Sequence, residues 1–166
     1  ITLYSEAQDG WQEVALVLNT AEAEGVSVAS ECVTINRPIA KGINAQLADL
    51  ILNGGGEGQS RYGFDFIERF LMAFGESAAV YLGGSEGAEE GGILVHGFDL
   101  EGAKELAPGT RIFLGGIEQA VDMVLKGEAS PLDFRWFIGR RRNVSISDGA
   151  WKPVACARPL ALKQCL

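Results

Sequence analysis

The chain has 166 residues, a formal net charge of −8 at pH 7, 47% hydrophobic residues and 22% charged residues. This length is typical of one domain, and the composition is that of a globular protein with an apolar core. No run of about 18 apolar residues occurs, so no transmembrane helix is expected. The cysteines lack the spacing of a metal site, which predicts free thiols in a reducing compartment. They are Cys32, Cys156 and Cys165.

The charge is distributed unevenly along the chain. Residues 1–133 contain 7 Lys and Arg against 21 Asp and Glu, whereas residues 134–166 contain 7 against 1. The two segments therefore carry −14 and +6, which indicates a polar contact surface near the C-terminal part of the chain. An overall negative field repels phosphates, and no basic repeat interleaved with aromatic residues is present. Nucleic acid is therefore not an expected partner.

The first third of the chain predicts two strands followed by a helix. The apolar run at residues 14–18 is typical of a buried strand, and residues 26–35 alternate with period two. Pro38 is expected to end this second strand, because proline cannot donate to the ladder. A helix then begins after Asn44, which is a good N-cap residue, and ends at Gly54.

The middle of the chain predicts a helix between two glycine-rich connections. Residues 54–63 read as a flexible loop. Phe66, Phe70 and Phe74 then recur every four residues, which indicates an amphipathic helix. Two apolar runs bounded by glycines follow and are typical of strands, with an acidic loop between them. These runs are AAVYLGG, residues 78–84, and GGILVHG, residues 91–97.

The last third predicts strands on either side of one more helix. Residues 109–116 read as a strand. The helix that follows has its apolar residues on one stripe. These are Ile117, Ala120, Val121, Val124 and Leu125. Residues 134–139 predict a strand with one mostly apolar face, and residues 150–157 predict the final strand. The mixed order of strands and about three helices favours an α+β fold rather than a doubly wound sheet, in a single domain over residues 1–166 with its core at about 14–157.

Residues with catalytic or metal-binding chemistry are sparse. None of the glycine clusters matches a phosphate-binding motif, and Glu86, Glu89 and Glu90 offer too few ligands for a calcium loop. His96 is the only histidine, and no serine lies in a G-x-S-x-G motif. We therefore expect His96 to be structural, with no catalytic, cofactor-binding or metal-ligating residues. An unrecognised hydrolase that uses His96 with a nearby serine or cysteine is kept as an alternative.

The basic residues of the C-terminal part are the candidate binding residues. The run from Arg140 to Arg142 fits either a solvated turn or a docking patch. Guanidinium groups bind carboxylates in bidentate fashion and are enriched at protein interfaces, which supports the docking interpretation. The predicted partner-binding residues are Arg135, Arg140, Arg141, Arg142, Lys152 and Arg158.

Five short motifs occur in a recognisable order. They are VTINRPI (33–39), VYLGG (80–84), GGILVHG (91–97), FRWFIG (134–139) and GAWKPVACA (149–157). In this order they resemble the YqgE/AlgH family and look most similar to its plastid-type members. The resemblance implies a compact fold in which a bifurcated, partly barrel-like mixed sheet is flanked by helices. It also implies no established enzymatic activity and no cofactor.

The chain departs from the family pattern at the arginines. Where the family has a turn and a helix after the strand at residues 134–139, this sequence predicts a shortened basic loop. Ser85 also stands where the family usually has proline. Any function that depends on the family's helix is therefore not expected to carry over to this chain.

The resemblance and the charge pattern together predict a non-enzymatic accessory protein. It would dock peripherally on a larger, membrane-embedded complex, such as the stromal face of photosystem I. The expected location is the plastid stroma in association with thylakoids, and a chain that starts at Ile1 fits a processed, imported protein. The main alternative is a soluble regulatory protein like the bacterial family members.

Overall fold

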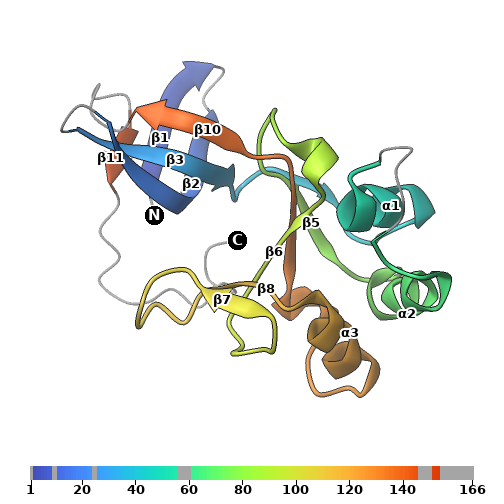
Figure 1. The fold of residues 1–166 in the computed structure, drawn as a ribbon. Helices are drawn as coiled ribbons and strands as arrows, with labels where there is room; N and C mark the ends of the chain where they lie inside the picture. Colours follow the sequence, from blue (N-terminus) through green and yellow to red (C-terminus); the bar gives the residue numbers. More distant parts are fainter. Residues whose placement is uncertain (1, 9–10, 24–25, 56–60, 146–150, 154–166) are drawn as a thin grey trace.

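The computed structural model describes residues 2–8, 11–23, 26–55, 61–145 and 151–153, and it confirms the predicted α+β fold. Within these residues the chain forms three α-helices and two β-sheets, and neither sheet closes into a barrel. The three helices lie together on one side of the molecule and the five-stranded sheet lies on the other (Figure 1). The six-stranded sheet lies between them, and its two faces contribute residues to two different core clusters.

The five-stranded sheet is antiparallel and is built around one long hairpin. Its strand order is β10-β3-β2-β1-β11, and β2 and β3 form its centre. Both central strands were predicted from sequence, although β2 extends well beyond the apolar run that indicated it. The strands are β1 (Thr2–Gln8), β2 (Trp11–Ala23), β3 (Val26–Thr34), β10 (Arg141–Ser145) and β11 (Trp151–Pro153).

The six-stranded sheet is mixed, with the order β4-β5-β9-β6-β8-β7. Strands β5 and β9 run parallel to each other, and the remaining neighbours are antiparallel. Strand β9 therefore occupies an interior position with a partner on each side. The strands are β4 (Pro38–Ala40), β5 (Ala79–Leu82), β6 (Ile93–His96), β7 (Ala103–Glu105), β8 (Phe113–Gly115) and β9 (Arg135–Ile138).

The three helices begin and end close to where the sequence predicts. In α1 the Asn44 side chain accepts a hydrogen bond from the Leu47 N–H at 2.9 Å, and Gly54 ends the helix with φ of 78°. Only glycine adopts that left-handed conformation at little cost, which explains the stop. The helices are α1 (Ala45–Asn53), α2 (Phe64–Phe74) and α3 (Ile117–Leu125), with short 3₁₀ turns η1 (Ala88–Glu90) and η2 (Pro131–Asp133).

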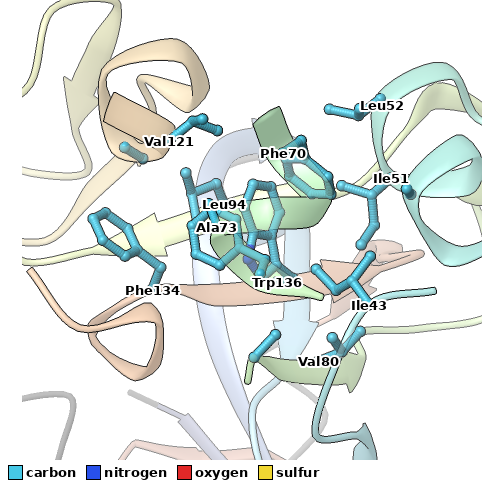
Figure 2. Packing of buried hydrophobic residues seen from close by; sticks show 14 of the residues in the cluster. Ile43, Ile51, Leu52, Phe70, Ala73, Val80, Leu94, Val121, Phe134 and Trp136 are labelled. Carbon is cyan, nitrogen blue, oxygen red and sulfur yellow. The ribbon is translucent and has the colours of Figure 1, made fainter. Parts of the chain in front are cut away.

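The larger core cluster lies between the helices and the six-stranded sheet. Trp136 in β9 is fully buried there, with Val80 of β5 and Leu94 of β6 as its cross-strand neighbours. Figure 2 shows the Trp136 ring beneath Phe70 of α2, and the two rings meet edge to face with centroids 5.2 Å apart. Such pairs contribute about 0.5–1.5 kcal/mol beyond the burial of their area. Phe70 and Phe74 of the stripe predicted for α2 are therefore buried in this core, and Phe66 is partly buried against it.

The opposite face of the six-stranded sheet packs on the hairpin of the other sheet. Tyr81 and Phe137 stack with ring centroids 5.3 Å apart and lie in the same apolar cluster as Leu16 of β2 and Val33 of β3. Strand β9 thus has all four residues buried on both faces. The predicted apolar face of β9 is confirmed, because Phe134, Trp136 and Ile138 belong to the larger core cluster. The sequence did not indicate that the opposite face, which carries Arg135 and Phe137, is buried as well.

Two other sequence predictions differ in part from the structure. Strand β3 ends at Thr34, ahead of Pro38 as predicted, but Pro38 itself begins a new strand, β4, at a sheet edge where proline is tolerated. Residues 140–142 do not form a loop, because Arg141 and Arg142 lie in β10 and pair with Cys32 and Glu31 of β3. Strands β1, β4 and β7 were not predicted, since none of them carries a clear apolar alternation.

Candidate functional site

The three consecutive arginines lie at a junction between the two sheets. Arg140 forms an isolated bridge with Glu86, in which each residue's N–H donates to the other's carbonyl at 2.7 and 3.0 Å. The chain then enters β10 at the edge of the five-stranded sheet, beside β3. The backbone of the arginine run is therefore hydrogen-bonded on both sides of the junction.

The arginine side chains meet glutamates of the same chain. The Arg140 Nη1 lies 2.6 Å from the Glu31 Oε1, and the Arg141 Nη2 lies 2.7 Å from the Glu13 Oε2. Arg142 donates a hydrogen bond to Glu90 of η1. We call this cluster of three arginines and three glutamates the arginine seam. It consists of Arg140, Arg141, Arg142, Glu13, Glu31 and Glu90.

The residues of the arginine seam differ in how deeply they are buried. Glu13 is buried and also accepts a hydrogen bond from the Thr34 hydroxyl, so its two carboxylate oxygens have separate partners. Arg142 and Glu90 are more exposed, and the hydrogen bond from Arg142 lowers the pKa of the Glu90 carboxyl. The seam therefore matches its charges inside the chain and connects β10 to β2, β3 and η1. The docking role of these arginines stays a prediction.

The other predicted binding residues lie apart from the seam. Lys152 is in β11, where its Cα is the partner of Leu3 in β1. Arg158 lies outside the described residues. Arg135 belongs to β9 in the other sheet, where it is buried. The structure thus brings together three of the six residues and separates Arg135 from them.

His96 lies in an aromatic environment with both ring nitrogens engaged by the backbone. Its Nε2 is 2.8 Å from the Gly115 carbonyl oxygen, so it carries the proton, and its Nδ1 accepts from the Phe98 N–H at 3.3 Å. The rings of Phe98, Phe113 and Phe134 surround it. Burial lowers the pKa of the imidazole and favours its neutral form. This geometry offers no support for the hydrolase alternative.

Cys32 lies in β3, where its Cα is the partner of Arg141 in β10, and it is buried. Burial raises its pKa to about 11, so the reactive thiolate is scarce at neutral pH. Cys156 and Cys165 lie outside the described residues. Among the residues that the structure describes, no cluster of three or more His, Cys, Asp or Glu side chains could hold a metal ion.

A cleft of about 710 Å³ opens at the beginning of the parallel strand pair β5 and β9. Arg135 is one of its lining residues, and only 6% of its surface is exposed. Its Nη1 donates to the Tyr81 hydroxyl at 2.9 Å, and its Cζ lies 5.9 Å from the centroid of the Tyr81 ring. The cleft is lined by Pro38, Ala40, Lys41, Glu76, Ser77, Ala78, Ala79, Val80, Tyr81, Ser130, Leu132, Asp133 and Arg135.

Strand pairing explains why Arg135 reaches this cleft. In the parallel register Ala79 lies beside Arg135, and Tyr81 lies beside Phe137. Side chains two residues apart share a face, so Tyr81 and Arg135 lie on one face of the sheet at its open end. The sequence predicted Arg135 as one of six partner-binding residues, and the structure places it in a different sheet from the arginine run. The feature of the sequence that could have predicted a buried Arg135 is its place in the otherwise apolar segment FRWFI.

The outer face of α2 carries two exposed apolar side chains. Phe64 is 72% exposed and Met72 is 76% exposed, and they lie two helical turns apart. The exposed Glu68 lies between them on the same side of the helix. Phe70 and Phe74, on the opposite side, are fully buried. The outer α2 face, defined by Phe64, Glu68 and Met72, is thus apolar at both ends and acidic at its centre.

Comparison of the chain with protein-family models, with curated proteins and with solved structures finds no significant match. The resemblance to the YqgE/AlgH family therefore stays a prediction that rests on the five motifs. Among the described residues, no helix has the length and apolar character needed to cross a bilayer.

Proposed function

We propose that this protein is a non-enzymatic accessory protein that docks peripherally on a larger assembly through the outer α2 face. The observation that supports the proposal is the pair of large apolar side chains, Phe64 and Met72, held in solvent on a helix whose other side is anchored in the core. Glu68 lies between the two side chains, so this surface offers two separate apolar positions rather than one continuous patch. Both side chains lie on the solvent side of α2, where a helix of a partner can pack against them.

The charges around the outer α2 face indicate what kind of partner fits it. Asp65 and Glu68 are exposed on α2, and Arg69 is already paired with Asp122 of α3. A partner segment would therefore meet two apolar positions and unmatched negative charge. The fitting partner is a basic amphipathic helix whose apolar side chains contact Phe64 and Met72 and whose lysine or arginine lies opposite Glu68.

The identity of the assembly follows only from the motif resemblance. If the chain is a plastid-type member of the YqgE/AlgH family, the assembly is a photosynthetic membrane complex such as photosystem I, approached from the stroma. The arginine seam carries no part of this proposal, because its charges are matched within the chain.

The test compares tagged wild-type protein with the Phe64→Ser/Met72→Ser double variant. Native membranes of the source cells are solubilised gently and separated by size, and the fraction of tagged protein that comigrates with a large complex is measured. We expect the double variant to lose most of that comigration. Ile39→Ser is the matched control, because Ile39 is also exposed and apolar but lies in β4.

The outcomes separate docking from the alternative functions. Both variants alter exposed positions, so each should change the free energy of unfolding by no more than about 0.5 kcal/mol. Loss of comigration in the double variant but not in Ile39→Ser supports the proposal. Equal comigration of all three proteins excludes the outer α2 face as the docking surface. Absence of wild-type protein from every large complex would favour the soluble regulator.

A further inference from the structure

We propose that Met72 is a reversible oxidation site, and that conversion of its thioether to the sulfoxide weakens docking at the outer α2 face. The effect on docking rests on the proposed function, whereas the selective oxidation of Met72 does not. Three observations support the proposal: the exposure of Met72, the contrast with Met123, and the burial of Cys32.

The Met72 side chain is open to solvent. It is 76% exposed, more than any other large apolar side chain among the described residues. It lies in the last turn of α2, on the side opposite to the buried Phe70 and Phe74. A sulfoxide oxygen formed here would meet water rather than packed side chains. Oxidation of Met72 therefore changes the surface of the protein and leaves the fold in place.

The chain contains one other methionine, and it packs against the core. Met123 lies in α3 and is partly buried against the larger core cluster. Its sulfur is less accessible to an oxidant, and a sulfoxide there would place a polar group against apolar side chains. The two methionines thus provide an internal comparison, in which Met72 is expected to react first.

The thiol that the structure describes is a poor competitor for the oxidant. Cys32 is 1% exposed, and burial raises its pKa to about 11. Little of the reactive thiolate is therefore present at neutral pH. Cys156 and Cys165 lie outside the described residues, so the test replaces both by serine to remove competing thiols.

The oxidation requires a hydroperoxide, of which hydrogen peroxide is the simplest. The sulfur lone pair attacks one peroxide oxygen, so that a sulfur–oxygen bond forms and the O–O bond breaks. The sulfur is oxidised by two electrons and the peroxide is reduced. The proton on the transferred oxygen passes to the departing hydroxide, which leaves as water. A methionine sulfoxide reductase reverses the change with two electrons from a pair of thiols, which become a disulfide, and the oxygen leaves as water.

Oxidation removes one of the two apolar positions that the outer α2 face offers to a partner. Phe64 and Met72 lie on either side of the exposed Glu68. On contact with an apolar side chain of the partner, the sulfoxide oxygen would lose its water without gaining a hydrogen bond. We therefore expect oxidation of Met72 to weaken docking at least about tenfold.

The first measurement is the rate of oxidation of each methionine. The full chain with Cys156→Ser and Cys165→Ser is treated with hydrogen peroxide, quenched with catalase and digested, and the sulfoxide at each position is quantified by mass spectrometry. We expect Met72 to be oxidised at least about tenfold faster than Met123 in the folded protein, and both at similar rates in urea. Equal rates in the folded protein would overturn the assignment of Met72 as the oxidation site.

The second measurement is docking after oxidation. Oxidised or untreated tagged protein, free of peroxide, is added in limiting amount to native membranes, and the fraction that comigrates with a large complex is measured. We expect this fraction to fall on oxidation and to recover after treatment with methionine sulfoxide reductase and dithiothreitol. Met72→Leu removes the oxidisable sulfur, so its comigrating fraction, whatever its level, should not change on peroxide treatment. Met123→Leu is the matched control and should still respond to peroxide.

The outcomes separate this proposal from the docking proposal. A loss on oxidation in the parent protein and in Met123→Leu, but not in Met72→Leu, supports it. Unchanged comigration of protein fully oxidised at Met72 would overturn the effect on docking, and so would an equal loss in Met72→Leu. If untreated protein never comigrates with a large complex, the docking proposal fails and the effect on docking fails with it. The oxidation rates then still decide whether Met72 is the oxidation site.

Discussion

Residues 134–138 and residues 140–142 are separated by one glycine, yet they are held in the fold by different interactions. The first segment contains β9, whose Trp136 is surrounded by apolar side chains from the helix layer. The second segment places three arginines against three glutamates in the arginine seam. One segment thus gains stability by leaving water, and the other retains its charges by pairing them.

The comparison shows how differently the two regions should respond to substitution. Apolar burial contributes roughly 25 cal/mol per Å² and does not depend on any single partner. A charge pair contributes little net free energy, but the loss of one partner leaves the other uncompensated. The core of β9 should therefore respond to changes in volume, whereas the arginine seam should respond to changes in charge, salt and pH.

The largest effect is expected from the core. Trp136→Ala should lower the free energy of unfolding by about 3–5 kcal/mol, because it leaves a cavity beside Phe70 and Phe74. Urea denaturation followed by circular dichroism measures the change. Trp136→Phe should cost clearly less. It keeps an aromatic ring and removes an indole N–H that has no hydrogen-bond partner among the described residues. An alanine variant within about 1 kcal/mol of wild type would contradict the packing described for β9.

The glycine between the two regions should be the next most sensitive position. Gly139 has φ of 70°, and a Cβ on it would lie 2.4 Å from the Gly84 carbonyl oxygen. Gly139→Ala should therefore cost about 3 kcal/mol, from backbone strain and from this overlap together. Gly109→Ala is the matched control, because Gly109 has φ of 81° with no atom within 4 Å of the added Cβ. The control should cost only about 1 kcal/mol, and equal losses would mean that the overlap is relieved freely.

The seam should lose less than the core when one charge is removed. Glu13→Gln leaves Arg141 without its carboxylate and should cost about 2 kcal/mol at low salt. The loss should shrink in high salt, because Arg141 is partly exposed and ions screen it. Glu89→Gln is the control, since Glu89 is exposed and lies in η1 next to the seam. If the denaturation midpoint shifted equally in Glu13→Gln and Glu89→Gln, the contact between Glu13 and Arg141 would not stabilise the fold.

The smallest expected effects are on the pH dependence of the free energy of unfolding, and they differ between the core and the seam. Burial lowers the pKa of His96 below its ordinary value of 6.5. Below pH 6.5 the imidazole is therefore protonated more readily in the unfolded chain than in the native protein. Stability should therefore fall as pH drops below 6.5, by at most about 1.4 kcal/mol per pH unit. His96→Gln should flatten this slope in unfolding measurements between pH 6.5 and 5.

The seam should respond to acid in a lower range. The pKa of Glu90 is lowered by Arg142 from its ordinary value of 4.5, so the stability from this pair is present above 4.5 and is lost as pH falls further. Glu90→Gln should remove this lower component and leave the slope above pH 5 unchanged. If Glu90→Gln instead altered the slope between pH 6.5 and 5, the assignment of the two ranges to core and seam would be wrong.

Local patterns predicted most of the regular structure. The cap residue Asn44 and the stop at Gly54 were read correctly for α1, because capping depends on groups within a few residues of each other. The apolar stripe of α2 was also predicted correctly. In α3, Ala120 and Val121 are buried as predicted, but Leu125 of the predicted stripe is exposed. Strands β4 and β7 were missed, since each has only three residues and is held by its neighbours rather than by its own pattern.

The arginine run was predicted as a basic loop, and the structure places Arg141 and Arg142 in β10 instead. It was interpreted as a solvated turn or a free docking patch, since arginines in a row usually face water. The partner of Arg140 in the seam, Glu31, is 109 residues away in the chain, so nothing near the arginines reveals the pairing. The composition already showed the complementary acidic excess, but not which glutamates would lie opposite.

By itself the amino-acid sequence determined the α+β class, the three helices with their buried faces, and the strands with strong apolar runs. These follow from contacts between residues close in the chain, whose geometry is set by backbone periodicity. Only the tertiary structure decided which distant side chains meet, such as Arg135 with Tyr81 across the parallel strands or Arg141 with Glu13 across the sheet. Strand order and register determine these contacts. Both depend on burying all the apolar faces of the sheets and helices at the same time.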